Sequence, residues 1–365
     1  MSNAEESALH YRFGDTLPEP GTTLEVAPGV RWLRMGLPFA LDHINLWLLR
    51  DCIEGVEGWT IVDCGIADDA TRANWSRIFD SGDLQGLPVL RLIVTHMHPD
   101  HIGLAHWLCE SHDLRLWISA TDYNVARIGS ESTSGFGRDS AAHFCARHGL
   151  VDPQALEQVR QRGGHYVNMV PAVPRSFRRL MDGMPVRIGT RTWHCIAGYG
   201  HAPEHIALHA PSTPDGGGSL LISGDMVLPR ISTNVSVGDM EPEADPLPLY
   251  LASIERFRAL PADTLVLPSH GKPFTGLHTR IDQLQAHHQA RFAEVLAACA
   301  DAPLSAADLL PVLFKRKLDP QQTPFAMGES VAHVHALAGM GKVTAVQGDD
   351  GVLRWRTLQV ARSEG

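Results

Sequence analysis

Residues 95–101 read Thr-His-Met-His-Pro-Asp-His, and this stretch decides the fold. Four of its side chains are common metal ligands: His96, His98, Asp100 and His101. Residues 90–95 (Leu-Arg-Leu-Ile-Val-Thr) predict a strand whose end would hold such a site rigidly. Imidazole favours zinc and similar ions, and carboxylate supplies a hard anionic oxygen. Three histidines and one aspartate exceed what one tetrahedral zinc takes from so short a segment, so the spacing predicts two metals that divide the ligands.

Chance is the competing explanation for any histidine pair in this chain, because the sequence holds 20 histidines. A lone His-x-His would carry little weight on that background. The longer pattern His-x-His-x-Asp-His directly after a β-rich stretch is much more specific, and it favours a metal site.

Four further segments carry Asp or His at or near the end of a predicted strand, in the order 60–65, 198–205, 221–225 and 265–271. Together with residues 96–101, they give the chain a pattern that resembles the metallo-β-lactamase-fold hydrolase superfamily. In that family five motifs lie at strand ends along one edge of a four-layer αββα sandwich. The resemblance covers roughly residues 25–275 and is specific for the fold rather than for the substrate.

The resemblance implies two sets of metal ligands joined by one bridging carboxylate. The first set is His96, His98 and His201, and the second is Asp100, His101 and His270. Asp225 would bridge the two metals. Asp63 would orient the ligand loop, and Asp100 would also hold the nucleophile or move protons.

One position departs from the family pattern. The third motif usually reads His-x-Pro-Gly-His, and here Glu204 replaces the glycine. Because glycine permits backbone dihedrals that glutamate resists, the turn after His201 is expected to differ. His205 is expected to begin a strand and to pack under the site rather than to bind metal.

The resemblance implies a dinuclear metal-dependent hydrolase that attacks its substrate with a metal-bridging hydroxide. Zinc is the expected metal, although iron or manganese could fill the same ligand set. A thioester or related small acyl compound is the leading substrate class, as in hydroxyacylglutathione hydrolases. A lactonase and a metal-dependent nuclease or phosphodiesterase remain alternatives, and so does a non-catalytic scaffold that keeps the fold.

The chain divides into three expected parts. Residues 1–4 resemble the remainder of a cleaved tag, and residues 5–278 form the metallo-β-lactamase-fold domain. Within it, residues 120–182 are expected to form a helical insertion that caps the substrate site, with a possible helix over 173–180. Residues 279–365 are expected to form a small winged-helix-like domain, with helices at 280–300, 305–314 and 329–340 and a closing hairpin.

Composition limits the partners. Net charge is −10, whereas nucleic-acid binders usually show a basic surface, so a small-molecule substrate is expected rather than a nucleic acid. The C-terminal domain is expected to be structural or to form a homodimer. No apolar run is long enough to span a membrane. Six scattered cysteines without a Cys-x-x-Cys pair suit reduced thiols, which predicts a cytoplasmic location.

Overall fold

The computed structural model describes residues 6–131, 137–214, 217–319 and 322–358. The tag assigned to residues 1–4 lies outside these ranges, as does part of the turn expected at 215–219. The chain forms two compact units. Unit 1 comprises Met1–Ser134, His165–Thr233 and Ser253–Asp282, and unit 2 comprises Gly135–Gly164, Asn234–Ala252 and Gln283–Gly365.

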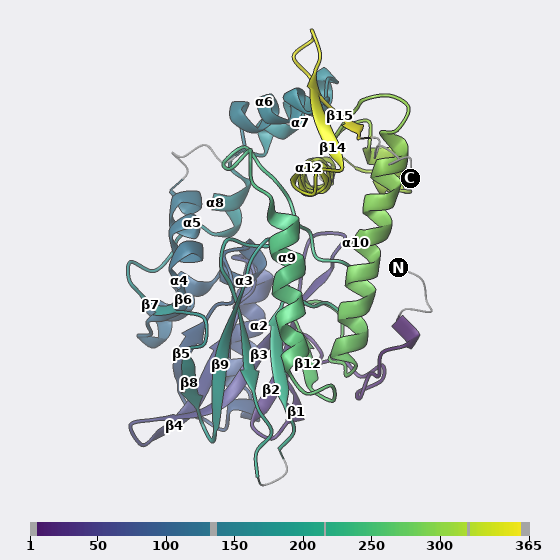
Figure 1. The fold of residues 1–365 in the computed structure, drawn as a ribbon. Coiled ribbons are helices and arrows are strands. Elements are labelled where there is room, and N and C mark those ends of the chain that lie inside the picture. The colour runs from purple at the N-terminus through teal and green to yellow at the C-terminus, as the bar shows by residue number, and fades with distance from the viewer. Residues whose placement is uncertain (1–5, 132–136, 215–216, 320–321, 359–365) are drawn as a thin grey trace. The chain divides into compact units, whose positions relative to one another are not determined.

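Two sheets form the centre of unit 1 (Figure 1). The first sheet has its seven strands in chain order: β1 (Leu24–Ala27), β2 (Val30–Gly36), β3 (His43–Ile53), β4 (Val56–Val62), β5 (Val89–Ile93), β6 (Leu116–Ser119) and β7 (Phe177–Leu180). The second runs in the order β12-β11-β10-β9-β8, with bounds β8 (Pro185–Ile188), β9 (Arg191–Gly198), β10 (His205–Ala210), β11 (Leu220–Gly224) and β12 (Leu265–Pro268). Neighbours from β1 to β4 are antiparallel, and those from β4 to β7 are parallel.

Alternation along β3 shows why the first sheet is buried on both faces. Trp47 and Leu49 join an apolar cluster with residues of the second sheet such as Trp193 and Leu208. Leu46 and Leu48 point the other way, as successive strand residues do, into a cluster on the helical side. Side chains therefore fill the space between the sheets.

Helices cover the outer faces of this pair of sheets. On the first sheet lie α2 (Asp69–Asp80), α3 (Pro99–Ile102), α4 (Ala105–His112), α5 (Ala120–Ser130) and α8 (His165–Met169). Beside the second sheet lie the η2 turn (Arg256–Ala259) and the parts of α9 (Pro246–Glu255) and α10 (Leu277–Ala298) that belong to unit 1. The four-layer α/β sandwich expected from the sequence is thus confirmed.

Unit 2 combines helices with a small sheet. Its elements are α6 (Asp139–Arg147), α7 (Pro153–Gln161), the rest of α9 and of α10, α11 (Leu310–Leu313), α12 (Thr323–Gly339), β13 (Leu304–Ser305), β14 (Val343–Gln347) and β15 (Leu353–Thr357). The three strands are antiparallel in the order β13-β15-β14. The predicted closing hairpin is confirmed. The predicted boundary at 278/279 stays a prediction, although residues 135–164 join the C-terminal residues in one unit.

Two element predictions were wrong. The possible helix over 173–180 is in part strand β7, because Phe177 to Leu180 pair in parallel with β6. The helix expected over 305–314 shrinks to α11. Ser305 and Asp308 instead bond each other's backbone N–H in a turn, and the helix begins only at Leu310, with Pro311 in its first turn. Within the described ranges, every helix is too short or too polar to traverse a lipid bilayer.

Candidate metal centre

The ligand-rich stretch lies where β5 ends and α3 begins. His98 is the N-cap of α3, and Pro99 occupies its first turn, where its fixed φ suits a helix start. The single helical turn then carries Asp100 and His101. A strand and a helix start thus fix both ends of the loop.

Four residues from three separate segments form a first group of donor atoms. They are His96, His98, His201 and Asp225, and their donor atoms lie within 4.8 Å of one another. His96 Nε2 lies 2.9 Å from His98 Nδ1 and 3.2 Å from His201 Nε2. Oδ2 of Asp225 lies 3.3 Å from His201 Nε2.

Asp100, His101 and His270 form a second group. Oδ2 of Asp100 lies 3.4 Å from His270 Nε2 and 3.7 Å from His101 Nε2. Oδ1 of Asp225 faces this group, at 3.4 Å from His101 Nε2 and 3.5 Å from His270 Nε2. The carboxylate of Asp225 therefore has one oxygen toward each group, and the structure brings all seven predicted side chains together.

The chemistry of these atoms fits divalent cations. Burial, together with the neighbouring imidazoles, holds the pKa of His96 and His98 well below the usual histidine value, so both rings are neutral. Neutral ring nitrogens converging at about hydrogen-bond distance suit a cation between them. Among the described residues, His101 Nε2 and Asp225 Oδ1 are buried and face each other at 3.4 Å without the geometry of a hydrogen bond. Such atoms are costly to bury unless something binds them.

Contacts at Nδ1 of His101 and of His270 orient the rings so that Nε2 of each faces the cluster. His101 Nδ1 lies 2.8 Å from Oδ2 of Asp63, and His270 Nδ1 lies 2.8 Å from the His43 carbonyl. Asp63 also accepts from the Thr95 N–H at 2.7 Å and from the Thr95 hydroxyl at 2.9 Å. Such outer contacts fix the tautomer and orientation of ligating histidines.

The charges inside the cluster favour a bound cation on the carboxylate side. Burial alone would lower the pKa of His101, but the carboxylates of Asp100, Asp63 and Asp225 raise it well above its usual value. Burial would raise the pKa of Asp225, but His270 and His101 hold it well below its usual range. The three acids therefore stabilise positive charge at this place.

His205 packs beneath the centre, as expected. It begins β10, is fully buried, and its Nε2 accepts the backbone N–H of Asp225 at 3.2 Å. Burial lowers its pKa to about 3, so the ring is neutral. Gly224 has a φ of +53°, and a Cβ there would lie 2.1 Å from His205 Nε2, so only glycine fits above the ring.

Two residues that touch the ligand loop were not singled out from the sequence. Asp122 accepts the N–H of Met97, and Tyr166 donates to the Met97 carbonyl. For Asp122, the pattern Ser119-x-x-Asp122 at a helix start was an available signal, because it is the spacing of a capping box. No local pattern marks Tyr166, whose partner is 69 positions away in the sequence.

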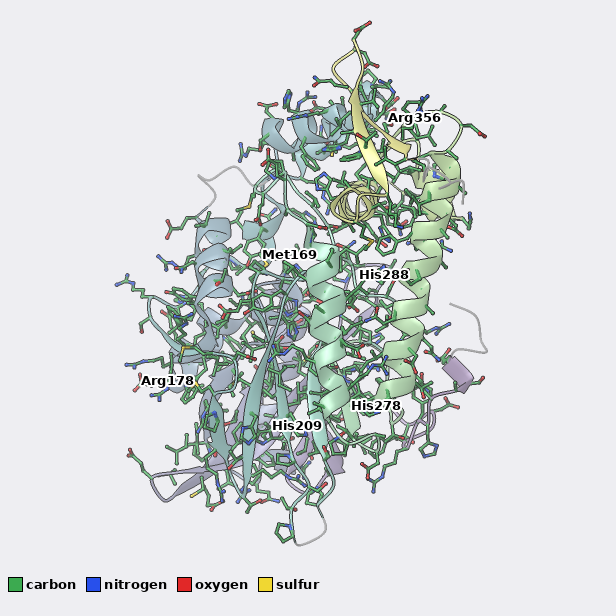
Figure 2. The ribbon with its side chains drawn as sticks, viewed as in Figure 1. Met169, Arg178, His209, His278, His288 and Arg356 are labelled. Carbon is green, nitrogen blue, oxygen red and sulfur yellow. The ribbon has the colours of Figure 1, made fainter. Side chains whose placement is uncertain are left out.

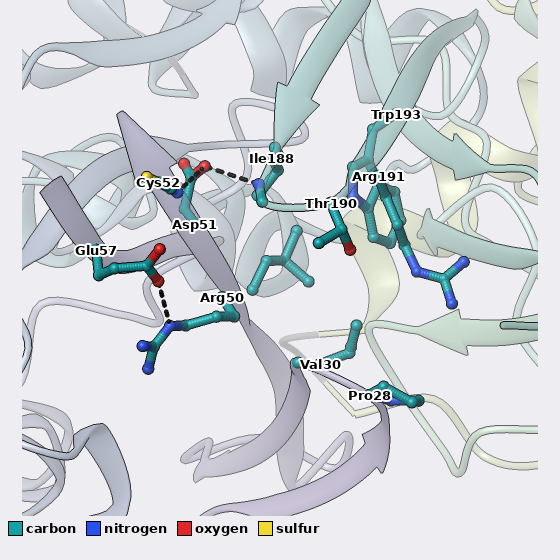
Figure 3. Close-up of a pocket in the computed structure, with 13 residues that line it drawn as sticks. Pro28, Val30, Arg50, Asp51, Cys52, Glu57, Ile188, Thr190, Arg191 and Trp193 are labelled. Atoms are coloured by element: carbon teal, nitrogen blue, oxygen red, sulfur yellow. Dashed lines mark hydrogen bonds and ion pairs between the residues drawn. The ribbon is translucent and has the colours of Figure 1, made fainter. Parts of the chain in front are cut away.

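A pocket of about 360 Å³ lies elsewhere in unit 1 (Figure 3). Its lining includes Arg50, Glu57 and the β8–β9 turn around Thr190. Glu57 stands at the start of β4, whereas Asp63 follows the end of that strand. The pocket is therefore separated from the metal-ligand cluster by the length of a strand, and we do not assign the substrate to it.

Two family models match separate stretches of the chain. A model of the Metallo-beta-lactamase superfamily matches residues 41–270. A second model, described as Metallo-beta-lactamase-like, C-terminal domain, matches residues 292–358. The first match contains all of the segments that supply the donor atoms.

Individual relatives resemble the chain over most of its length. A beta-lactamase domain protein from Burkholderia ambifaria has a crystal structure with a TM-score of 0.91 at 56% identity, covering 98% of this chain and 100% of that one. A metallo-beta-lactamase family protein from Thermus thermophilus has a TM-score of 0.72 at 26% identity, covering 92% and 100%. A hydroxyacylglutathione hydrolase from Chromohalobacter salexigens is 25% identical over 88% of this chain and 94% of its own length.

Proposed function

This chain belongs to the metallo-β-lactamase superfamily and is a metal-dependent hydrolase; from that premise we propose that it cleaves thioesters of small acyl groups. The seven converging side chains carry the proposal, because they match a two-cation hydrolytic centre in number and type. The substrate class draws on the relative that is named a hydroxyacylglutathione hydrolase.

In this proposal the two groups of donors hold two divalent cations. His96, His98, His201 and Oδ2 of Asp225 hold the first, and Asp100, His101, His270 and Oδ1 of Asp225 hold the second. Zinc is the first choice because five of the seven residues are histidines, and iron or manganese would suit the same set. When bound, such cations supply a hydroxide nucleophile at neutral pH and polarise the acyl carbonyl.

The chain's own carboxylates divide the remaining work. Asp100 has 17% of its side chain exposed, against 10% for Asp225 and 1% for Asp63, so it is the acid that solvent and substrate reach. We assign it the task of accepting the proton of the attacking water. Asp225 holds the two groups in register, and Asp63 keeps His101 in the tautomer whose Nε2 faces the site.

The leaving group favours a thioester over an unactivated ester or amide. A thiol has a pKa of about 8.5, so a thiolate departs near neutral pH without a proton donor. An alkoxide or an amine is a poorer leaving group and would depend on Asp100 returning the proton that it accepts from the water.

The test is thiol release from a panel of acyl-glutathione and acyl-CoA thioesters, with Asp225→Ala as the blank. Turnover by the native protein that the variant loses supports the proposal. Bound metal without thioester turnover would contradict it. Hydrolysis of lactones or of phosphodiesters in the same samples would then identify the alternative substrate class.

A further inference from the structure

The backbone of Met97 is held by two residues outside the ligand loop. Met97 stands between the candidate ligands His96 and His98. Its N–H donates to Oδ1 of Asp122 at 2.8 Å, and its carbonyl accepts from the Tyr166 hydroxyl at 2.6 Å. The N–H belongs to the peptide that joins His96 to Met97, and the C=O belongs to the peptide that joins Met97 to His98. Because each peptide is planar, the two bonds fix the orientation of the peptide on either side of Met97, and each of these peptides is shared with a candidate ligand.

Asp122 also reaches the segment that supplies the third histidine. Its Oδ2 accepts the backbone N–H of Glu204 at 2.6 Å, and Glu204 lies three residues after His201. The carboxylate is fully buried, so these bonds are made away from competing water. One side chain therefore joins the loop of His96 and His98 to the turn that follows His201.

The start of α5 holds Asp122 in place for this role. Ser119 caps the helix: its hydroxyl accepts the N–H of Asp122 at 3.2 Å, and it donates to Oδ2 of Asp122 at the same distance. The next contact reinforces the link, because the Thr121 hydroxyl donates to Oε2 of Glu204 at 2.9 Å. The contacts at the start of α5 thus hold Asp122 in the position from which it bonds the two loops.

Resting on the proposed function, we propose that Asp122 and Tyr166 are positioning residues for the first cation. They set the separation of the three ring nitrogens by holding the two peptides that flank Met97 and, through Asp122, the turn after His201. Both residues lie within 120–182. This segment therefore holds the metal-ligand loop in position, in addition to its expected role as a cap over the substrate site. Outer-shell partners of this kind typically change metal affinity by about 10–100-fold.

The decisive variant is Tyr166→Phe, because it removes only the hydroxyl. Tyr123→Phe is its matched control: Tyr123 is a buried tyrosine on α5 whose hydroxyl donates to a backbone carbonyl, that of Pro174, at 2.7 Å. The zinc-loaded proteins are mixed with a chromogenic chelator, and the rate of zinc release and the Tm of each metal-free protein are measured. We expect release about tenfold faster in Tyr166→Phe, and an unchanged rate in Tyr123→Phe despite a similar loss of Tm.

Asp122→Asn supplies a second, independent reading. Asparagine offers one oxygen where the N–H groups of Met97 and Glu204 need two acceptors, so its zinc release should be at least as fast as that of Tyr166→Phe. Adding Tyr166→Phe to Asp122→Asn should change the rate less than it does in the native protein, because both side chains hold the backbone of one residue, Met97. The absorption spectrum of the cobalt-substituted protein should shift in both single variants and stay unchanged in Tyr123→Phe.

Equal zinc release by Tyr166→Phe and Tyr123→Phe, in a preparation that cleaves thioesters, would overturn the positioning role alone. Faster release in Tyr166→Phe, in a preparation that cleaves no thioester, would overturn the substrate assignment alone. A native protein that holds no zinc in the chelator assay would overturn both.

Discussion

Oδ2 of Asp63 lies 2.8 Å from Nδ1 of His101, although the two residues stand 38 positions apart in the sequence. Asp63 adopts a φ of +61° to make this contact, a left-handed conformation that aspartate tolerates better than most residues. The same carboxylate takes up the N–H and hydroxyl of Thr95, so three donors depend on two oxygens. Nε2 of His101 is thereby left facing the metal-ligand cluster.

Replacing Asp63 by asparagine should weaken metal binding about 10–100-fold with a similar loss of kcat, because an amide N–H2 would then face one of those donors. Zinc affinity by chelator competition measures the effect. Asp51→Asn is the matched control, since Asp51 is buried and bonds Thr60 and the Gly189 N–H away from the metal-ligand cluster. Metal loss of the same size in Asp51→Asn would show that the effect is one of general stability.

Asp225→Ala should lose at least one metal per chain and lower kcat/KM by more than about a hundredfold, because both groups lose a ligand oxygen. Metal content after gel filtration, read by plasma mass spectrometry, measures this. Asp263→Ala is the control, an exposed carboxylate in the turn before β12. Full metal content and full turnover in Asp225→Ala would contradict the bridging assignment.

Glu204→Gly restores the residue usual in the family, and we expect it to destabilise this chain by about 1–2 kcal/mol. Glu204 has an ordinary negative φ here, so glycine relieves no strain and adds freedom to the unfolded chain. The hydrogen bond from Thr121 is also lost. Urea unfolding measures the change, and Glu204→Gln, which keeps an acceptor, should be near native. A glycine variant more stable than the native chain would contradict this role.

Unit 2 should lose stability in acid through two buried histidines. Burial lowers the pKa of His288, on α10 (Figure 2), to about 3 and that of His333 to about 4. In the unfolded chain the rings have a pKa of about 6.5. The contribution of the two neutral rings to folding stability is therefore complete above that pH and is lost as the pH falls below it. At pH 5.5 each ring should destabilise the fold by about 1.4 kcal/mol relative to pH 7.5 or above.

Urea unfolding of the metal-free protein at pH 7.5 and pH 5.5 tests this. The free energy of unfolding should differ between the two pH values by about 1.4 kcal/mol less in His288→Gln than in the native protein, because one ring no longer contributes. His194→Gln is the control, because His194 is exposed on β9. An identical pH dependence in the native protein and in His288→Gln would show that the fold does not lower the pKa of His288.

The sequence predicted the sandwich and the seven donor residues because both depend on local signals. A strand ending in His or Asp is visible in consecutive residues, and five such endings in order carry the resemblance to a known family, which implies how the strands meet. Even His205 was placed correctly, since its neighbours alternate like a strand. The two-metal count, the zinc, the dimer and the cytoplasmic location stay predictions, as do the ligand roles.

What could not be predicted depends on pairing between distant segments. Phe177 lies in a strand because β6 offers it a parallel edge, which no window around residue 177 reveals. The bonds of Asp122 and Tyr166 to Met97 likewise bridge 25 and 69 positions. The place of residues 135–164 in unit 2 depends on contacts with residues that come more than a hundred positions later.

The division into interleaved units has a consequence for folding during synthesis. The chain passes between unit 1 and unit 2 at residues 134, 164, 233, 252 and 282, so unit 2 is assembled from three separated pieces. On the ribosome, residues 135–164 and 234–252 emerge well before the stretch beyond 282 that they pack with. They must wait with apolar surface uncovered, a state prone to aggregation. A gene truncated after residue 282 should therefore yield an insoluble product rather than a trimmed enzyme, and chaperone demand should peak before the last stretch is translated.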